Sequence, residues 1–312
     1  MPTDPTSSQA ARRRLLHLQR TDGGWSYRPA SPASAVEPTA MASLALLATD
    51  SADDRAAPLR GGQWIAARAR RPDGSTVVSP GSEVAPGWTT SYALLLWNAL
   101  GGFAVERSGA VAWLLATRGK PVEPVPHNPM GHDVTLVGWP WVADTHSWVE
   151  PTAASILALA PSVPLDQPRM REGVRVLLDR AIATGGWNLG NPVVFGQTLR
   201  SLPGPTGLAL LALARVARKS SPQPIIQPAV TYLGGVVRQT NAPSSLGWAW
   251  LGLRAWGARP DAAAVDHLAR ATERALARNS SAVELAMILL ASGDRSMHLL
   301  GLTPRGESEF GR

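Results

Sequence analysis

The sequence contains no cysteine and very little tyrosine or phenylalanine. Cysteine is absent from all 312 residues, which excludes disulfide bonds, a thiol nucleophile and any zinc site with a Cys ligand. Tyr and Phe occur three times each, against 12 Trp. Most of the aromatic residues are therefore tryptophans, and this excess must have a structural or functional reason.

Long apolar runs and a leader segment are also missing. No run approaches the roughly 18 apolar residues of a membrane-spanning helix, and residues 1–11 are polar with two prolines, unlike a signal peptide. We therefore expect a cytoplasmic protein, and a membrane-peripheral location remains open as an alternative.

The positive charge of the chain is dispersed. Lys+Arg 30 exceed Asp+Glu 23, which gives a net charge of +7, but only residues 12–14 and 68–71 form basic clusters. A nucleic-acid-binding domain usually has a denser basic stripe, so we expect no nucleic-acid partner. The hydrophobic content of 45% and charged content of 17% are typical of a globular chain.

Internal repeats dominate the sequence. Residues 36–47, 87–96, 149–159 and 203–213 share a Pro/Thr-rich start followed by small and apolar residues, and each contains a threonine in one frame (Thr39, Thr89, Thr152 and Thr206). Weaker copies follow at 247–255 and 282–291. Because these six segments are apolar on nearly every side, they predict buried helices.

A second kind of segment alternates with the first. Residues 10–20, 61–71, 108–118, 171–182, 228–238 and 261–278 carry one apolar stripe and a charged face, which is typical of surface helices. Six buried helices inside six amphipathic ones predict an all-α fold, a single (α/α)6 toroid around a central cavity. We expect the toroid over residues 10–292, a disordered N-terminal tail over 1–9 and a C-terminal tail over 293–312.

One motif gives a family resemblance. Leu15, Gln19, Gly23 and Trp25 form the pattern L-x3-Q-x3-G-x-W, and residues 185–187 contain a degenerate copy. The pattern resembles the QW repeat of the terpenoid cyclase and protein prenyltransferase superfamily, as in squalene-hopene-type cyclases. The resemblance implies an α/α toroid with an apolar cavity for an isoprenoid. It also implies that Gln19 binds backbone groups of a neighbouring helix and that Trp25 stacks on it.

The resemblance also indicates a reaction. The zinc site of the protein prenyltransferases needs a cysteine, which this chain lacks. Class II cyclases protonate an alkene or epoxide with the middle Asp of a D-x-D-D-T-A motif. Alignment of that motif on Thr152 and Ala153 places Glu150 on the proton donor, whereas Trp148 and Pro151 replace the flanking carboxylates. The implied function is protonation-initiated cyclisation of a polyprenyl substrate.

Glu150 also has a structural interpretation. Pro151 suits the first position of a helix, which would make Glu150, like Glu37 in the first repeat, an ionised helix cap. The helix dipole at such a position favours the charged form. Only desolvation by neighbouring rings, such as Trp139, Trp141 and Trp148, would raise the pKa of Glu150 against that field.

The longest connection, residues 121–149, lies before the third buried helix and should reach the mouth of the cavity. In the cyclase interpretation Asp133, Asp144 or Glu150 is the acid, and His132 or His146 is its hydrogen-bond partner. The expected substrate-binding residues are aromatic or acidic side chains at the same end: Tyr27, Glu37, Trp88, Tyr92, Trp139, Trp141 and Trp148.

Other functions remain open from the sequence. The spacing of His127, His132, Asp133 and His146 matches no strong metal motif, so we expect no metal or other cofactor. The expected partner is an apolar isoprenoid small molecule, with a peripheral membrane contact and a homodimer left open. The alternatives are a non-catalytic isoprenoid-binding or protein-interaction toroid, and a zinc-independent prenyl-diphosphate transferase that holds the diphosphate at the helix N-termini.

Overall fold

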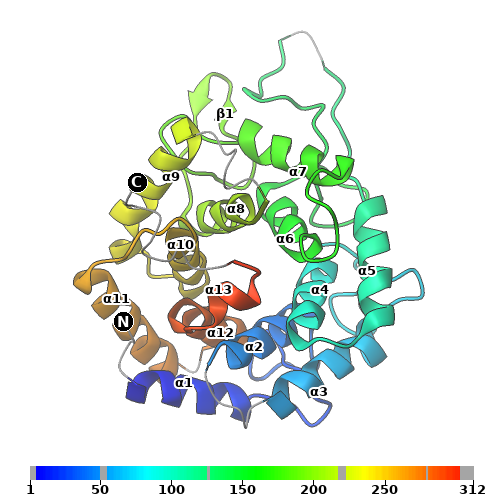
Figure 1. The fold of residues 1–312 in the computed structure, drawn as a ribbon, viewed down its shortest axis with the longest axis vertical. Coiled ribbons are helices and arrows are strands. Elements are labelled where there is room, and N and C mark those ends of the chain that lie inside the picture. The colour runs from blue at the N-terminus through cyan, green and yellow to red at the C-terminus, as the bar shows by residue number, and fades with distance from the viewer. Residues whose placement is uncertain (1–4, 50–54, 125–126, 217–222, 279, 303–312) are drawn as a thin grey trace, which may run out of the picture.

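The helices α1–α12 form two concentric rings (Figure 1). The computed structural model describes residues 5–49, 55–124, 127–216, 223–278 and 280–302. The inner ring consists of α2 (Val36–Ala48), α4 (Thr89–Leu100), α6 (Val149–Leu159), α8 (Pro203–Val216), α10 (Pro243–Ala255) and α12 (Ala282–Ser292). The outer ring consists of α1 (Pro5–His17), α3 (Ala56–Trp64), α5 (Ala104–Ala116), α7 (Pro168–Asp179), α9 (Gln223–Val236) and α11 (Ala262–Ala277).

The inner ring is closed. Each inner helix packs against the next along the chain, and α12 packs against α2. The inner helices are buried over nearly their whole length, because they contact inner neighbours on two sides and outer helices behind. The predicted all-α double ring is therefore confirmed.

Shorter elements complete the fold. The π-helical turn η2 (Ile65–Ala69) extends α3, and the 3-10 turn η3 (Val237–Gln239) extends α9. A small hairpin pairs β1 (Val193–Val194) with β2 (Gln197–Thr198). A last helix, α13 (Ser296–Leu299), contacts α2, α10 and α12 and lies within the ring in the axial view (Figure 1).

The observed boundaries differ from the predicted ones at both ends. Helix α1 begins at Pro5, so residues 5–9 of the expected N-terminal tail are helical. Residues 293–302 of the expected C-terminal tail pack against the toroid through α13. Residues 1–4 and 303–312 lie outside the described residues.

A tryptophan joins the two rings in three of the repeats. The indole N–H donates to a carbonyl oxygen of the preceding outer helix, and the backbone N–H of the same residue donates to the Oγ1 of a threonine in the next inner helix. The indole bonds are Trp25 to Leu15 (2.8 Å), Trp139 to Leu114 (2.8 Å) and Trp187 to Leu177 (2.6 Å). The backbone bonds are Trp25 to Thr39 (2.9 Å), Trp139 to Thr152 (3.0 Å) and Trp187 to Thr206 (2.9 Å).

The second repeat keeps the threonine without the tryptophan. The backbone N–H of Thr76 donates to Thr90 Oγ1 at 3.0 Å. Sequence comparison places Thr89 in the frame of Thr39, but the hydrogen bonds place Thr90 there, a shift of one residue. The shift matters because it decides which α4 side chains share a face with those of α2 and α6.

Gln19 binds a neighbouring helix, as expected. Its Nε2 donates to the carbonyl oxygens of Gly23 and Ala57, both at 2.9 Å, and Ala57 lies in the first turn of α3. The first and second repeats are therefore linked through one side-chain amide.

We predict that the threonine bond stabilises the fold measurably. Replacing Thr206 by Val keeps the side-chain shape but leaves the buried backbone N–H of Trp187 without its partner. The free energy of unfolding should fall by about 1–3 kcal/mol in urea denaturation. The control is Thr272→Val in α11, where the hydroxyl bonds only to Leu268 O of its own helix, and the loss should stay below about 1 kcal/mol. Equal losses in the two variants would contradict the prediction.

Candidate functional site

Two glutamates and a tryptophan occupy one position in three successive inner helices. Glu37 in α2, Trp88 just before α4 and Glu150 in α6 each lie two residues before the threonine that accepts the backbone bond from the preceding loop. Because the repeats share this register, the three side chains lie at the same end of the inner ring.

The two glutamates do not cap their helices. The N-cap residues are Ala35 for α2 and Trp148 for α6, and neither cap makes a side-chain hydrogen bond. Glu150 is the second residue of α6, and Pro151 is the third rather than the first. A proline is accepted there because the N–H groups of the first helical turn have no partner in the helix. The interpretation of Glu37 and Glu150 as helix caps is therefore wrong.

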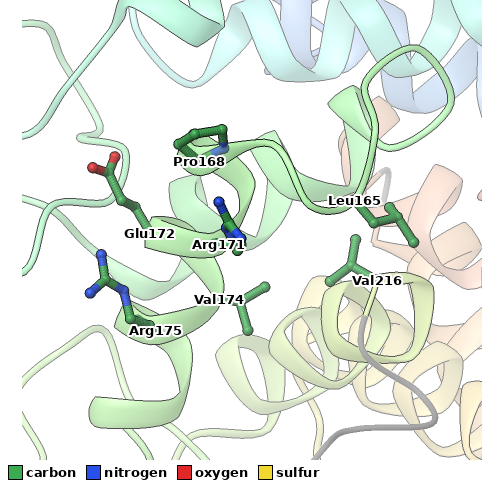
Figure 2. Close-up of a pocket in the computed structure, with 7 residues that line it drawn as sticks. All are labelled: Leu165, Pro168, Arg171, Glu172, Val174, Arg175 and Val216. Atoms are coloured by element: carbon green, nitrogen blue, oxygen red, sulfur yellow. The ribbon is translucent and has the colours of Figure 1, made fainter.

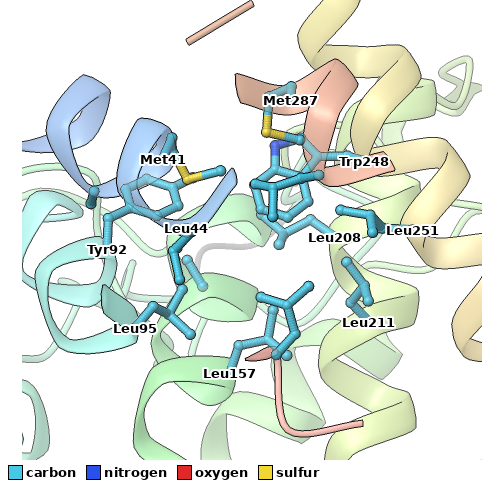
Figure 3. Close-up of a cluster of buried hydrophobic side chains, with 14 of the residues drawn as sticks. Met41, Leu44, Tyr92, Leu95, Leu157, Leu208, Leu211, Trp248, Leu251 and Met287 are labelled. Atoms are coloured by element: carbon cyan, nitrogen blue, oxygen red, sulfur yellow. The ribbon is translucent and has the colours of Figure 1, made fainter. Parts of the chain in front are cut away.

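The helical register turns both carboxyl groups toward the axis of the toroid. Residues at i, i+4 and i+7 share one face of a helix, so Glu37 shares a face with Met41 and Leu44, and Glu150 shares a face with Leu157. Figure 3 shows Met41, Leu44 and Leu157 directed toward the space between the helices. The glutamates therefore lie at the N-terminal mouth of this inward-facing stripe.

Glu37 is held by two donors. Tyr27 Oη and Trp88 Nε1 both donate to its Oε2, at 2.7 and 3.0 Å. The ring of Trp88 meets that of Trp141 edge to face, with centroids 5.6 Å apart. Both hydrogen bonds end on the same carboxylate oxygen. Burial raises the pKa of Tyr27 above its ordinary range, and the negative charge of Glu37 and the hydrogen bond to it add to the shift.

Glu150 has no such support. Its carboxyl has no hydrogen-bond partner among the residues that the structure describes. Burial raises the pKa of Glu150 from its ordinary 4.5 to about 7, and the negative charge of Glu37 is the second cause. The desolvation that the cyclase interpretation requires is therefore present.

Tyr92 connects the two glutamates electrostatically. It lies on α4, four residues after Trp88, and is buried. Its pKa is raised well above the ordinary range by burial, then by the charges of Glu37, Glu150 and Tyr27. The Tyr92 phenol therefore interacts electrostatically with Glu37, Glu150 and Tyr27, and it lies on α4, between α2 and α6 in the inner ring.

Below the glutamates the lining is apolar. We call the following side chains the axial lining: Met41, Leu44, Tyr92, Leu95, Leu157, Leu208, Leu211, Trp248, Leu251 and Met287 (Figure 3). They come from all six inner helices and are at most 8% exposed. Leu208, Leu211, Trp248, Leu251 and Met287 were not among the residues predicted from the sequence. The spacing of four and seven residues from the glutamate position would have found the α8 pair.

The acidic and basic residues predicted on the long loop lie elsewhere. Asp133 is exposed, and its Oδ1 accepts bonds from Thr135 that lower its pKa. Asp144 is exposed with a φ of 67°. His146 is exposed and bonds through Nδ1 to Lys120 O at 3.0 Å.

The fourth loop candidate, His132, is half-buried, and its Nδ1 has no hydrogen-bond partner within the described part of the chain. No interaction joins any of these four loop residues to Glu150 in the described residues. Their catalytic roles stay predictions.

The predicted tryptophans lie in three different settings. Trp139 is 1% exposed, and its indole N–H donates to a carbonyl oxygen of α5. The Arg169 guanidinium lies 3.8 Å from the centroid of its aromatic ring. Like Trp25 and Trp187, Trp139 therefore packs between the outer and inner helices. Trp88 and Trp141 stay at the mouth beside Glu37. Trp148 is half-buried at the N-cap of α6 and lies against Gly190.

A separate groove lies outside the inner ring. It has a volume of about 580 Å³ and is lined by residues of the α6–α7 connection, α7 and the end of α8 (Figure 2). Its acidic residue, Glu172, is already paired with Arg118 at 2.9 Å and Arg169 at 3.2 Å. The groove therefore offers no free acid and is not the predicted site.

The described residues offer neither a cluster of metal ligands nor a membrane-spanning helix. The described residues contain no group of three or more His, Asp or Glu side chains placed to hold a metal ion. Within the same residues, no helix is long and apolar enough to cross a membrane.

Comparison with known proteins supports the fold. No protein-family model matches the sequence, and no curated protein matches it. Among solved structures, a variant of the type II terpene cyclase MstE from Scytonema, in complex with geranylgeranyl dihydroxybenzoate (substrate), has a TM-score of 0.61 at 16% identity. That match covers 94% of this chain and 97% of MstE.

Two further structures match over similar lengths. A second MstE variant, in complex with merosterolic acid A (product), has a TM-score of 0.62 at 16% identity, with the same coverage of 94% and 97%. A glycosidase in complex with glucose has a TM-score of 0.59 at 11% identity, over 96% of this chain and 97% of that one. At these identities the likeness establishes the terpene-cyclase-like toroid as a fold.

We predict that Glu150 makes the stability of the protein depend on pH. Its pKa is about 7 in the folded state against an ordinary 4.5, so between these values the folded state binds the proton and the unfolded state does not. Stability should fall by about 1–3 kcal/mol as the pH rises from 4.5 to 7. Glu150→Gln should remove this component in urea denaturation at matched pH values, and an unchanged slope would contradict the assignment.

We also predict that Glu37 influences the titration of Glu150. Glu37→Gln removes the neighbouring negative charge, so the pKa of Glu150 should fall from about 7 toward its ordinary value. The measurement is carboxyl ¹³C NMR of Glu-labelled protein, with Glu150→Gln to assign the resonance. Glu273→Gln on the exposed face of α11 is the control and should leave the titration unchanged. A Glu150 pKa that stays near 7 without Glu37 would show that burial alone sets it.

Proposed function

We propose that the protein binds an apolar isoprenoid within the toroid and starts its cyclisation by protonation from Glu150. The observation that carries the proposal is the carboxyl of Glu150, which is half-buried, has no hydrogen-bond partner among the described residues and has its pKa raised to about 7. It stands at the mouth of a lining made of Leu, Met, Tyr and Trp side chains.

The proposed step is a single proton transfer. Below pH 7 the neutral carboxyl of Glu150 donates its proton to a carbon of a terminal alkene. The π electrons form the new C–H bond, and the remaining carbon becomes a tertiary cation. The next alkene of the chain closes a ring on that cation, and loss of a proton or addition of water ends the reaction. Glu150, now a carboxylate, regains a proton from water for the next cycle.

Aromatic rings support the cationic stage. The faces of Trp88, Tyr92 and Trp248 lie at the mouth and along the axial lining, where each attracts a cation by about 0.5–2 kcal/mol. The carboxylate of Glu37 adds a negative charge at the same end. The lining offers few other polar groups, so water that would quench the cation early is excluded.

Glu37 supplies a second carboxylate, which the aligned D-x-D-D-T-A positions of this chain lack. In the class II pattern carboxylates flank the proton donor, and here Trp148 and Pro151 stand in their places. A second carboxylate comes instead from another repeat. Tyr27 and Trp88 donate to Glu37, and its negative charge adds to the burial that raises the pKa of Glu150. We propose that this pair replaces the flanking carboxylates.

The site favours an uncharged isoprenoid over two other ligands. A prenyl diphosphate would bring negative charge to a mouth that already carries Glu37 and Glu150, which weakens the transferase alternative. A sugar, as bound by the structurally similar glycosidase, would leave its hydroxyl groups without partners against the apolar lining. The MstE complexes with a geranylgeranyl substrate and its product support an isoprenoid.

We expect Glu150→Gln to abolish turnover while leaving the fold intact. The purified protein is incubated at pH 6 with geraniol, farnesol and geranylgeraniol, and cyclic products are measured by gas chromatography with mass spectrometry. Glu150→Gln should lower the rate by about 10²–10⁴-fold, because the amide cannot donate an equivalent proton. Glu273→Gln should retain the rate.

Two outcomes would count against the enzyme. Unchanged turnover in Glu150→Gln would remove Glu150 as the acid. Binding of the isoprenoids without any product, in both the unmodified protein and the control, would favour the non-catalytic isoprenoid-binding toroid.

A further inference from the structure

The groove outside the inner ring lies at the opposite end of the toroid from Glu150. Leu165, which follows the end of α6, and Val216, the last residue of α8, both line it, whereas Glu150 is at the start of α6. The rest of the lining comes from the side of α7 that faces away from the core (Figure 2). The groove volume of about 580 Å³ is within the range of pockets that hold small molecules.

One part of this groove is apolar. Leu165 and Val216 lie beside each other, and Val174 of α7 lies between them and Arg175 in the view of Figure 2. Leu165 is 44% exposed, and the two valines are half-buried. Three apolar side chains from three segments therefore form a partly exposed surface. An apolar chain laid against it would remove that surface from water, which is favourable.

A cationic part lies next to the apolar one. Arg171 and Arg175 are one turn apart on α7, and both are exposed. Neither guanidinium forms a hydrogen bond or an ion pair with any residue that the structure describes. The pKa of Asp133 is lowered mainly by its bonds from Thr135, and the charge of Arg175 adds to that shift. The N–H groups of both arginines therefore stay available to a ligand.

The acid of the groove does not neutralise these two cations. Glu172 Oε2 accepts from Arg118 at 2.9 Å and from Arg169 at 3.2 Å. Asp166, which follows Leu165 in the chain, is exposed and is not among the described residues that line the groove. The one lining carboxylate is thus already paired with two arginines, and the groove has an excess of positive charge.

Only a ligand with two chemically different parts satisfies both parts of the groove. Arginine side chains bind phosphate and carboxylate oxygens through paired N–H groups, and side chains one turn apart on a helix are close enough to share one head group. An inorganic anion would use the arginines and leave the apolar surface in water. An uncharged apolar molecule would cover that surface and leave both arginines without a partner.

We propose that the groove binds a small amphiphile, with an oxyanion head on Arg171 and Arg175 and an apolar chain against Leu165, Val174 and Val216. The inference goes beyond the proposed function, because it concerns a second ligand at the other end of the toroid. A single amphiphile suits the site better than a bilayer does, since the apolar side chains line a concave groove of limited volume.

The test compares one amphiphile with its two halves. Dissociation constants of decyl phosphate, decanol and inorganic phosphate are measured by isothermal titration calorimetry on the full chain, below the concentration at which decyl phosphate forms micelles. Decyl phosphate should bind at least about tenfold more tightly than either half. Its affinity should fall as the salt concentration rises, because the two arginines are exposed to solvent.

A charge-matched pair of variants tests the head-group site. The double variant Arg171→Gln, Arg175→Gln should weaken the binding of decyl phosphate by at least about tenfold, because it removes both charged donors. The control is the double variant Arg270→Gln, Arg278→Gln at the exposed side and the end of α11. It changes the net charge equally and should retain the affinity.

A second pair of variants tests the apolar part. Leu165→Ala should weaken decyl phosphate by about threefold to tenfold, because it removes part of the surface that the chain covers. The control is Leu59→Ala on α3, where the leucine is 43% exposed, against 44% for Leu165. It should leave the affinity unchanged. Both leucines are nearly half exposed, so both variants should keep the fold.

Several results would overturn the inference. These are equal affinities for decyl phosphate in the two arginine double variants, or decanol binding as tight as that of decyl phosphate. Binding to phosphatidylglycerol vesicles that requires Arg171 and Arg175, without binding of decyl phosphate, would assign the arginines to a lipid surface instead. Glu150→Gln should leave the affinity for decyl phosphate unchanged, and a loss there would place the amphiphile at the mouth. None of these results bears on turnover by Glu150, which is measured separately.

Discussion

The fold depends on one repeated interaction, a loop residue fixed to the threonine that begins an inner helix. In the strongest copies that residue is a tryptophan whose backbone N–H bonds to the threonine and whose indole bonds to the preceding outer helix. Because every bond is buried, loss of either partner leaves an unsatisfied polar group. The interaction fixes the relative heights of α2, α4, α6 and α8. It therefore fixes which side chains meet at the axis.

The candidate site is a consequence of that common height. Glu37 and Glu150 arise from copies of the same repeat, yet their surroundings differ. Tyr27 and Trp88 donate to Glu37, whereas no described residue donates to Glu150. Burial, and after it the negative charge of Glu37, raises the pKa of Glu150. The repeat therefore places two carboxyl groups at equivalent positions, and residues that differ between the repeats give them different surroundings.

Much of the architecture could be predicted from the pattern of residues. Segments that are apolar on all sides alternate with amphipathic ones, and only a double ring buries the first kind six times. The site was harder to place, because the loop at 121–149 gathers His, Asp and Trp residues without bringing them to the acid. Trp139 illustrates the difficulty: it belongs by sequence to the loop and by contact to the packing between rings. Asp133 and Asp144 are exposed for the same reason, since a loop that crosses the mouth turns much of its length to solvent.

The sequence by itself determined the number of helices in each ring and the alternation of the rings, because these follow from local periodicity, and a motif made Glu150 the candidate acid. It could not determine the start of the inner helices to within one residue, and that residue decides whether Glu150 caps α6 or faces the axis. Only the tertiary structure brought Glu37, Tyr92 and Glu150 from three repeats into one electrostatic group. This result depends on the relative heights of helices distant in the chain, which no local pattern encodes.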